Sequence, residues 1–151
     1  ETRVLPVRFD KLRDHPAFGD DGFTPDGRVD VIGRWAGPGG ARSLILNGHV
    51  DVVSPGDASL WSDPPWSGVV RDGWLHGRGS CDMKSGLAAG IFALVVLHDL
   101  AWRPRGDIIV ESVTGEESGG ADTARHRGDP SRCAGRFWPH ASTWCPSASS
   151  R

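Results

Sequence analysis

Cysteine is scarce in this 151-residue chain, which contains only three. Two of them, Cys133 and Cys145, lie close to its C-terminal end, and such a distribution does not make the disulfide framework of a small secreted domain. The first residues also lack the charged and apolar segments of a signal peptide. We therefore expect a reducing, cytoplasmic location. The chain starts at Glu1 rather than Met, so we expect further residues before it.

Long hydrophobic runs and an excess of charge are lacking too. No uninterrupted apolar run approaches the roughly 18 residues that a membrane-spanning helix needs, so we expect no membrane partner. The net charge is −2, which gives no sign of the basic surface that binds nucleic acid. The length suffices for one domain with a real core.

Residues 121–151 contain no Val, Ile, Leu or Met, and no apolar period survives there. Such a segment buries too little apolar surface to offset the entropy lost on ordering. One interpretation is a natural disordered tail. The other is translation of a GC-rich gene out of frame from about residue 121, and the abundance of Arg, Ser, Pro, Trp and Cys favours it. We therefore expect residues 1–120 to form the folded part.

Apolar periodicity over residues 1–120 predicts an α/β domain. The predicted strands are residues 2–8, 29–35, 43–47 and 107–114, with a hairpin around Asp72-Gly73 and a loop over residues 10–30. The continuous apolar run at 43–47 is typical of a strand buried on both faces. Residues 83–100 predict a helix that is apolar nearly all round and is therefore buried against the sheet. Asp82 is expected at its N-cap.

One imidazole and four carboxylates stand where the predicted elements begin or end. His49 and Asp51 come directly after one buried strand, and Glu116 and Glu117 come after another. Asp82 precedes the helix. Open α/β sheets bind ligands at the C-terminal ends of their strands. Because zinc accepts His, Asp and Glu donors, the pattern predicts a metal site.

The order of these residues suggests a role for each. His49 and Asp51 share a face of an extended chain, so His49 could bind metal while Asp51 orients its imidazole. Asp82 has two oxygens and could bridge two ions, and Glu117 could hold one of them. Glu116 is then free to accept a proton from the water that attacks an amide carbonyl, and to pass it to the leaving amine.

Each feature taken alone has a simpler explanation. A lone His-x-Asp is most often a surface pair, a lone Glu-Glu is most often solvated, and Asp82 could be only a helix cap. Gly77-x-Gly79 resembles a dinucleotide-binding loop, but the third glycine is replaced by Asp82, so that signal is weak. The joint occurrence of these features at strand ends favours the metal site.

The motifs around these residues resemble those of the M20 metallopeptidase family, most closely its acetylornithine deacetylase and succinyl-diaminopimelate desuccinylase branch. The resemblance covers roughly residues 29–120. It rests on Gly48-His49-Val50-Asp51-Val52-Val53, Trp61-x-x-Pro64-Pro65, Asp72-Gly73-x-Leu75-x-Gly77-Arg78-Gly79-x-x-Asp82-Met83-Lys84 and Gly115-Glu116-Glu117.

The resemblance implies a partial three-layer, zinc-peptidase-like catalytic domain with a mixed or parallel sheet. It implies two zinc ions, with cobalt or manganese as substitutes, and hydrolysis of an amide bond in an N-acyl amino acid or small peptide. His49, Asp82 and Glu117 match metal ligands, with Asp82 as the bridge. Asp51 matches the residue that supports the histidine, and Glu116 matches the general base. Deacylase and dipeptidase activities are not separated by these motifs.

The chain also departs from the family pattern. The family uses a further acidic ligand after the Glu pair and a histidine near its C-terminus, whereas this chain has no Asp or Glu after Asp129. The family's lid domain, which carries dimer contacts and substrate-binding groups, has no counterpart. We therefore expect the N-terminal part of a catalytic domain whose homodimer is lost. The alternative function is a catalytically inactive fragment with weak or no metal binding.

A separate zinc knuckle in the tail is a third possibility. Its ligands would be His126, Cys133, His140 and Cys145. Their spacing lacks the closely spaced cysteine pair of such sites, so the sequence does not favour it.

Overall fold

The computed structural model of the chain describes residues 1–7, 27–117 and 136–137. Its strands are β1 (Thr2–Pro6), β2 (Val29–Trp35), β3 (Leu44–His49), β4 (Val69–Arg71), β5 (Trp74–His76), β6 (Ile108–Val113) and β7 (Arg136–Phe137). Its helix is α1 (Ser85–Asp99), and its two short turns of helix are η2 (Ala58–Leu60) and η3 (Ser80–Lys84).

Five strands form one sheet in the order β1-β2-β6-β3-β7. β1 and β6 both pair with β2 in antiparallel fashion, whereas β3 pairs in parallel with β6 and β7. The parallel strands β3 and β6 are joined by a crossover that contains α1, as parallel neighbours require. β4 and β5 form a separate hairpin. The predicted α/β class with a mixed sheet is therefore confirmed.

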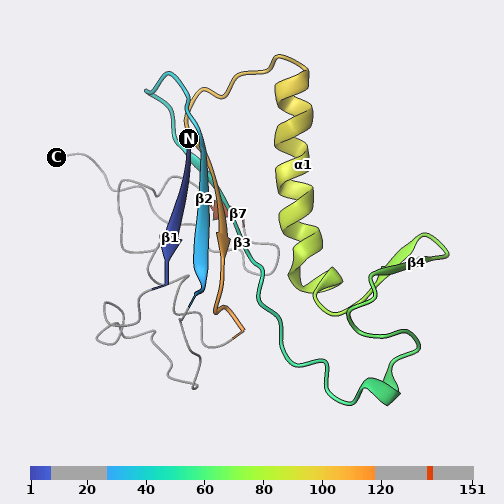
Figure 1. The fold of residues 1–151 in the computed structure, drawn as a ribbon. Coiled ribbons are helices and arrows are strands. Elements are labelled where there is room, and N and C mark those ends of the chain that lie inside the picture. Colours follow the sequence, from blue (N-terminus) through green and yellow to red (C-terminus); the bar gives the residue numbers. More distant parts are fainter. Residues whose placement is uncertain (8–26, 118–135, 138–151) are drawn as a thin grey trace.

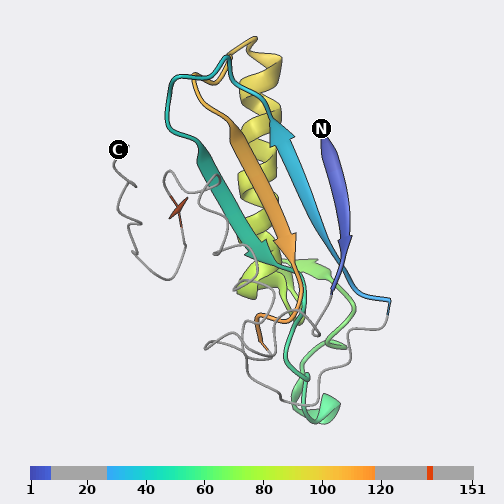
Figure 2. The same ribbon diagram turned by 90° about the vertical axis from the view of Figure 1, so that its left-hand side faces the viewer.

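The helix α1 lies along one face of this sheet (Figures 1 and 2). An apolar cavity between them is lined from the sheet by Leu46 and Val110, and from the helix by Leu87 and Ile91. Side chains alternate across a strand, so the neighbouring positions face the other way. Ile45 and Ile109, next to Leu46 and Val110, therefore lie on the opposite face, and together with Ile32 they form the buried core cluster.

The sequence predicted most strand positions to within two residues. β2 spans residues 29–35 as expected, and the hairpin forms with Asp72 and Gly73 at positive φ. β3 ends at His49, so this histidine is the last strand residue rather than the first residue after the strand. The predicted loop at 10–30 lies mostly outside the described residues. So does the predicted tail at 121–151, apart from β7, and both stay predictions.

The prediction that Asp82 caps the helix is wrong. The N-cap of α1 is Lys84, and Asp82 has extended backbone angles, φ −114° and ψ 104°, within η3. The cause is an irregular turn between Gly79 and the first helical residue, in which Met83 is buried. The Asp82 carboxylate lies instead beside the His49 ring, with Oδ1 3.1 Å from Nε2.

The prediction that α1 is buried against the sheet is wrong, because the helix is at most half-buried, at Leu87, Gly90, Leu94 and Leu97. No residue of the helix is buried, and Phe92 on its outer side is 68% exposed. The reason is that the sheet covers one face, and no other described element covers the opposite one. By length and composition alone, Ser80–Asp99 could also cross a membrane. One such helix is weak evidence, because the core helix of a soluble protein passes the same test.

The Asp107 carboxylate joins two segments at the end of the sheet that lies away from His49. Arg34 Nε donates to Asp107 Oδ2 at 2.7 Å, and the Gly37 N–H donates to Asp107 Oδ1 at 3.0 Å. These hydrogen bonds, with Arg34 the larger cause, lower the pKa of Asp107. The ion pair therefore forms at neutral pH and is lost as the pH falls through the titration of this carboxyl group. The Arg34–Asp107 ion pair connects the end of β2 to the residue before β6.

We expect Gly106→Ala to destabilise the fold by about 1–3 kcal/mol, because overpacked sites cost that much. A Cβ at this position would lie 2.2 Å from the carbonyl oxygen of Arg42, which is backbone and has little room to move. Gly33→Ala is the matched control, since a Cβ there meets no atom within 4 Å. Urea unfolding followed by circular dichroism measures both. Equal midpoints for the two variants would contradict this packing argument.

Candidate metal centre

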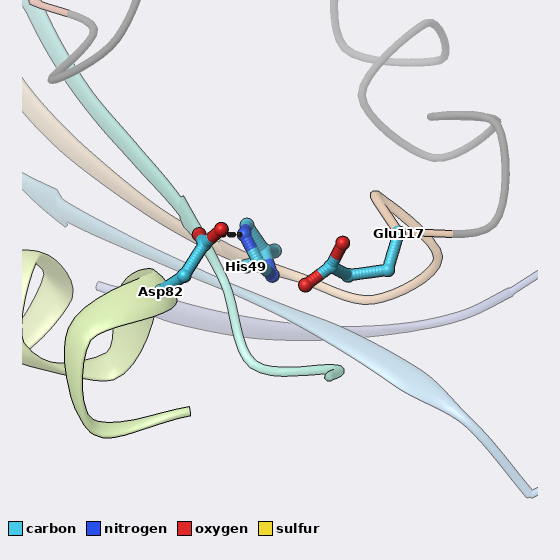
Figure 3. Close-up of side chains that lie close together, drawn as sticks. All are labelled: His49, Asp82 and Glu117. Atoms are coloured by element: carbon cyan, nitrogen blue, oxygen red, sulfur yellow. Dashed lines mark hydrogen bonds and ion pairs between the residues drawn. The ribbon is translucent and has the colours of Figure 1, made fainter. Parts of the chain in front are cut away.

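His49 occupies the end of β3 and is 4% exposed. The preceding Gly48 explains how another segment reaches it. A Cβ at position 48 would lie 3.1 Å from Met83 Cε and 3.2 Å from Leu87 Cβ. Glycine therefore lets the start of the helical segment approach the strand, and Asp82, next to Met83, comes to lie beside the imidazole (Figure 3).

Both ring nitrogens of His49 face oxygen atoms that accept hydrogen bonds. Nδ1 lies 3.0 Å from the carbonyl oxygen of Asp51, and Nε2 lies 3.1 Å from Asp82 Oδ1. A neutral imidazole carries one N–H, so it can donate to only one of them. If Nδ1 donates, the Nε2 lone pair points at a carboxylate oxygen. A cation between Nε2 and Asp82 would satisfy both groups.

The three predicted ligands come together in the structure. Ligand atoms of His49, Asp82 and Glu117 all lie within 4.8 Å of one another (Figure 3). Atoms bonded to one zinc ion at about 2.0–2.2 Å from it lie at most about 4.4 Å apart, so small side-chain rotations would close the set. One imidazole with two carboxylates is a donor set that zinc accepts. The residues present therefore fit the metal that the motifs imply.

The centre is open on one side. The Asp82 side chain is 64% exposed, whereas His49 is buried. Glu116 lies beside the cluster, with Oε2 3.8 Å from His49 Nε2, and its side chain is 35% exposed. Water and a small substrate could therefore reach the carboxylates of Asp82 and Glu116 while the imidazole stays shielded.

Asp51 connects His49 to the turn that carries Glu116 and Glu117. Its Oδ2 accepts the backbone N–H of Glu117 at 3.1 Å, and its Oδ1 lies 3.5 Å from His49 Nδ1. Oδ1 is buried and has no hydrogen-bond partner. The sequence predicts that this carboxylate orients the imidazole. In the structure the nearer oxygen is the Asp51 carbonyl, and the carboxylate holds the Glu117 backbone.

Two residues that the sequence argument gave no role also hold these segments. Lys84 Nζ donates to the carbonyl oxygen of Val50 at 2.6 Å, which ties η3 to the strand end. Asp30, which is fully buried in β2, accepts the N–H of Thr114 at 3.1 Å. A weak signal existed for Asp30, because strand alternation places it on the same face as the buried Ile32.

Lys84→Met is expected to weaken zinc binding by about tenfold, because residues that support metal ligands typically contribute 10- to 100-fold to affinity. Removing a positive charge near the site would by itself strengthen cation binding. The sign of the change therefore separates positioning from electrostatics. Chelator competition measures the affinity. Arg103→Met removes the same charge from a residue whose hydrogen bond goes to the carbonyl of Trp102, and it serves as the control. Tighter zinc binding by the Lys84 variant would contradict the positioning role.

The chain is similar to a known protein family and to several curated proteins. Residues 45–137, more than half of the chain, match the family model described as Peptidase family M20/M25/M40. The chain is 49% identical over 82 residues to N-formyl-4-amino-5-aminomethyl-2-methylpyrimidine deformylase of Halalkalibacterium halodurans, covering 54% of the chain and 19% of that protein. It is 44% identical over 94 residues to succinyl-diaminopimelate desuccinylase of Paracoccus denitrificans, covering 62% of the chain and 24% of that protein.

A solved structure supports the same fold. The crystal structure of human carnosine dipeptidase 1 superposes with a TM-score of 0.68 at 21% identity, covering 89% of the chain and 28% of that protein. At this identity the likeness shows the fold alone. The chain thus spans about a fifth to a quarter of the length of the two curated relatives.

Proposed function

Since the chain belongs to the M20/M25/M40 peptidase family, we propose that it carries the metal-binding part of a zinc-dependent hydrolase. The reaction is cleavage of an amide bond in an N-acyl amino acid or a small peptide. The observation that carries this proposal is the meeting of His49, Asp82 and Glu117, with Glu116 beside them.

Each residue has a defined task in this proposal. His49 Nε2, Asp82 and Glu117 hold zinc, with cobalt or manganese as substitutes. A zinc ion supplies Lewis acidity that polarises the substrate carbonyl and makes a water molecule easier to deprotonate. Glu116 accepts the proton of that water and returns it to the leaving amine. Asp51 keeps Glu117 beside the imidazole through the Glu117 N–H.

The relatives suggest the class of substrate. By their names, one removes a formyl group and the other a succinyl group. An acyl group on nitrogen is common to both and to the acetylornithine-type substrates that the motifs imply. Both relatives come from bacteria. We place the reaction in the cytoplasm, where small metabolites of this kind are processed.

A second function is favoured by one observation. Within the described part of the chain, the cluster of three ligands suffices for one ion, whereas the family resemblance implies two. Under this alternative, the polypeptide binds one zinc ion weakly or none, and it has no hydrolytic activity.

One experiment separates the two functions. The full chain is titrated with zinc under chelator competition, and it is assayed with N-formyl, N-acetyl and N-succinyl amino acids and a dipeptide. Zinc binding with turnover of any of these supports the hydrolase. Weak or absent zinc binding without turnover supports the inactive alternative. Absence of zinc binding also overturns the proposed metal centre.

A further inference from the structure

The turn that carries Glu116 and Glu117 is held at both ends by carboxylates. At its start, Asp30 Oδ1 accepts the N–H of Thr114 at 3.1 Å. At its end, Asp51 Oδ2 accepts the N–H of Glu117 at 3.1 Å. Asp51 belongs to the motif around His49, whereas Asp30 lies in β2 and has no part in the proposed chemistry.

The position of Asp30 is unusual for a carboxylate. It is fully buried, and burying a charged group is unfavourable unless hydrogen bonds compensate. Its strand does not require the side chain for sheet pairing, because β2 already pairs with β6 through backbone groups such as those of Val31 and Ser112. The carboxylate instead reaches past the end of β6 to Thr114, the first residue after that strand.

The backbone next to Thr114 is also tied to the histidine segment. The Val50 N–H donates to the carbonyl oxygen of Val113 at 2.9 Å. Val113 is therefore fixed relative to His49, and Thr114 is fixed relative to β2. The direction in which the chain leaves β6 is thus set at two successive residues, and Glu116 and Glu117 follow within three positions.

We propose that Asp30 is a positioning residue that sets the placement of Glu117, and with it Glu116, relative to His49. The inference rests on the proposed function for its metal readout, but its backbone readout is independent of any metal. A carboxylate accepting a backbone N–H makes a stronger hydrogen bond than a neutral acceptor does. Loss of that bond frees the start of the turn, so the two Glu carboxylates no longer meet the imidazole at one place.

The test uses two variants of the full chain. Asp30→Ala removes the acceptor, whereas Asp30→Asn keeps an acceptor oxygen without the charge. In the metal-free protein, amide hydrogen exchange by NMR should become at least about tenfold faster at Thr114 and Glu117 in the Ala variant. The amides of Ile45 and Leu46 in β3 should exchange as in the parent. The Asn variant should show the same pattern with a smaller increase, and it decides the test if the Ala variant does not fold.

Zinc affinity gives the second readout. Asp30→Ala should weaken zinc binding by about 10- to 100-fold, as loss of a supporting residue does. In a Glu117→Gln background the same change should have no further effect, since Asp30 acts through Glu117. Faster exchange throughout β2, β3 and β6 would show a general structural role and overturn the proposal. So would unchanged zinc affinity with fast exchange at Thr114. A parent that binds no zinc defeats the proposed function, and the exchange pattern then decides the role of Asp30.

Discussion

Replacement of His49 by alanine is expected to weaken zinc binding by more than about a hundredfold, because loss of a direct ligand exceeds the 10- to 100-fold typical of supporting residues. The imidazole is the one nitrogen donor of the cluster, and it lies between the carboxylates of Asp82 and Glu117 (Figure 3). Without it, two carboxylates remain, and an open pair of this kind holds a divalent ion weakly. Chelator competition with zinc measures the change.

The matched control for this variant is His98→Ala. His98 lies in the last turn of α1, and its exposed side chain pairs with Asp99 and contacts the Trp35 ring. It should leave zinc affinity unchanged. Thermal unfolding of both variants, followed by circular dichroism, establishes that the loss at His49 is not a loss of fold. A folded His49 variant that binds zinc within threefold of the parent would remove this residue from the metal centre.

Glu116→Gln is expected to lower hydrolysis by about 10²- to 10⁴-fold, the usual contribution of a general base, while zinc affinity changes little. Glutamine has nearly the same shape as glutamate but cannot accept the proton. Glu116 lies outside the three-ligand cluster, 3.8 Å from His49 Nε2.

The neighbouring residue supplies the comparison for this prediction. Glu117→Gln changes the same chemical group one position later in the chain, and it should lose zinc affinity as well as activity. The two variants therefore assign the base and the ligand separately. If Glu116→Gln loses zinc and Glu117→Gln keeps it, the two roles are exchanged. The zinc measurement alone decides this, whether or not the parent turns over a substrate.

The sequence predicted the residues of the centre better than their surroundings. His49, Asp82 and Glu117 were expected to meet because each stands at the boundary of a regular element. In the structure, the adjacent strands β3 and β6 end at the same end of the sheet, and the three residues lie close together there. Their roles as ligands stay predictions. Strand β2 was predicted correctly over residues 29–35, because its apolar positions alternate and turn residues flank it.

What the sequence missed depends on contacts between distant residues. Asp82 was expected at the N-cap because an Asp before an apolar helical pattern is typical of a cap. In the structure an irregular turn precedes the helix, and its buried Met83 side chain lies against Gly48. The hydrogen bonds of Lys84 to Val50 and of Asp30 to Thr114 join positions 34 and 84 residues apart. Local periodicity holds no information about such pairs.

The prediction that α1 is buried was wrong for a different reason. An apolar pattern all round a helix indicates that both sides favour contact with other apolar groups. This pattern does not identify which segment covers the side of the helix that faces away from the sheet. The sheet lies along one side of α1, and Phe92 on the other side is 68% exposed.

The place of β6 in the sheet has a consequence for the order of folding. β6 lies between β2 and β3, although it follows both in the chain by a long interval. Pairing across such intervals closes large loops and is slow compared with local structure formation. β6 is also the strand that leads into Glu116 and Glu117. We therefore expect that a chain in which β3 and α1 form before β6 pairs would present His49 and Asp82 without Glu117, and that tight zinc binding would follow only once β6 has joined the sheet.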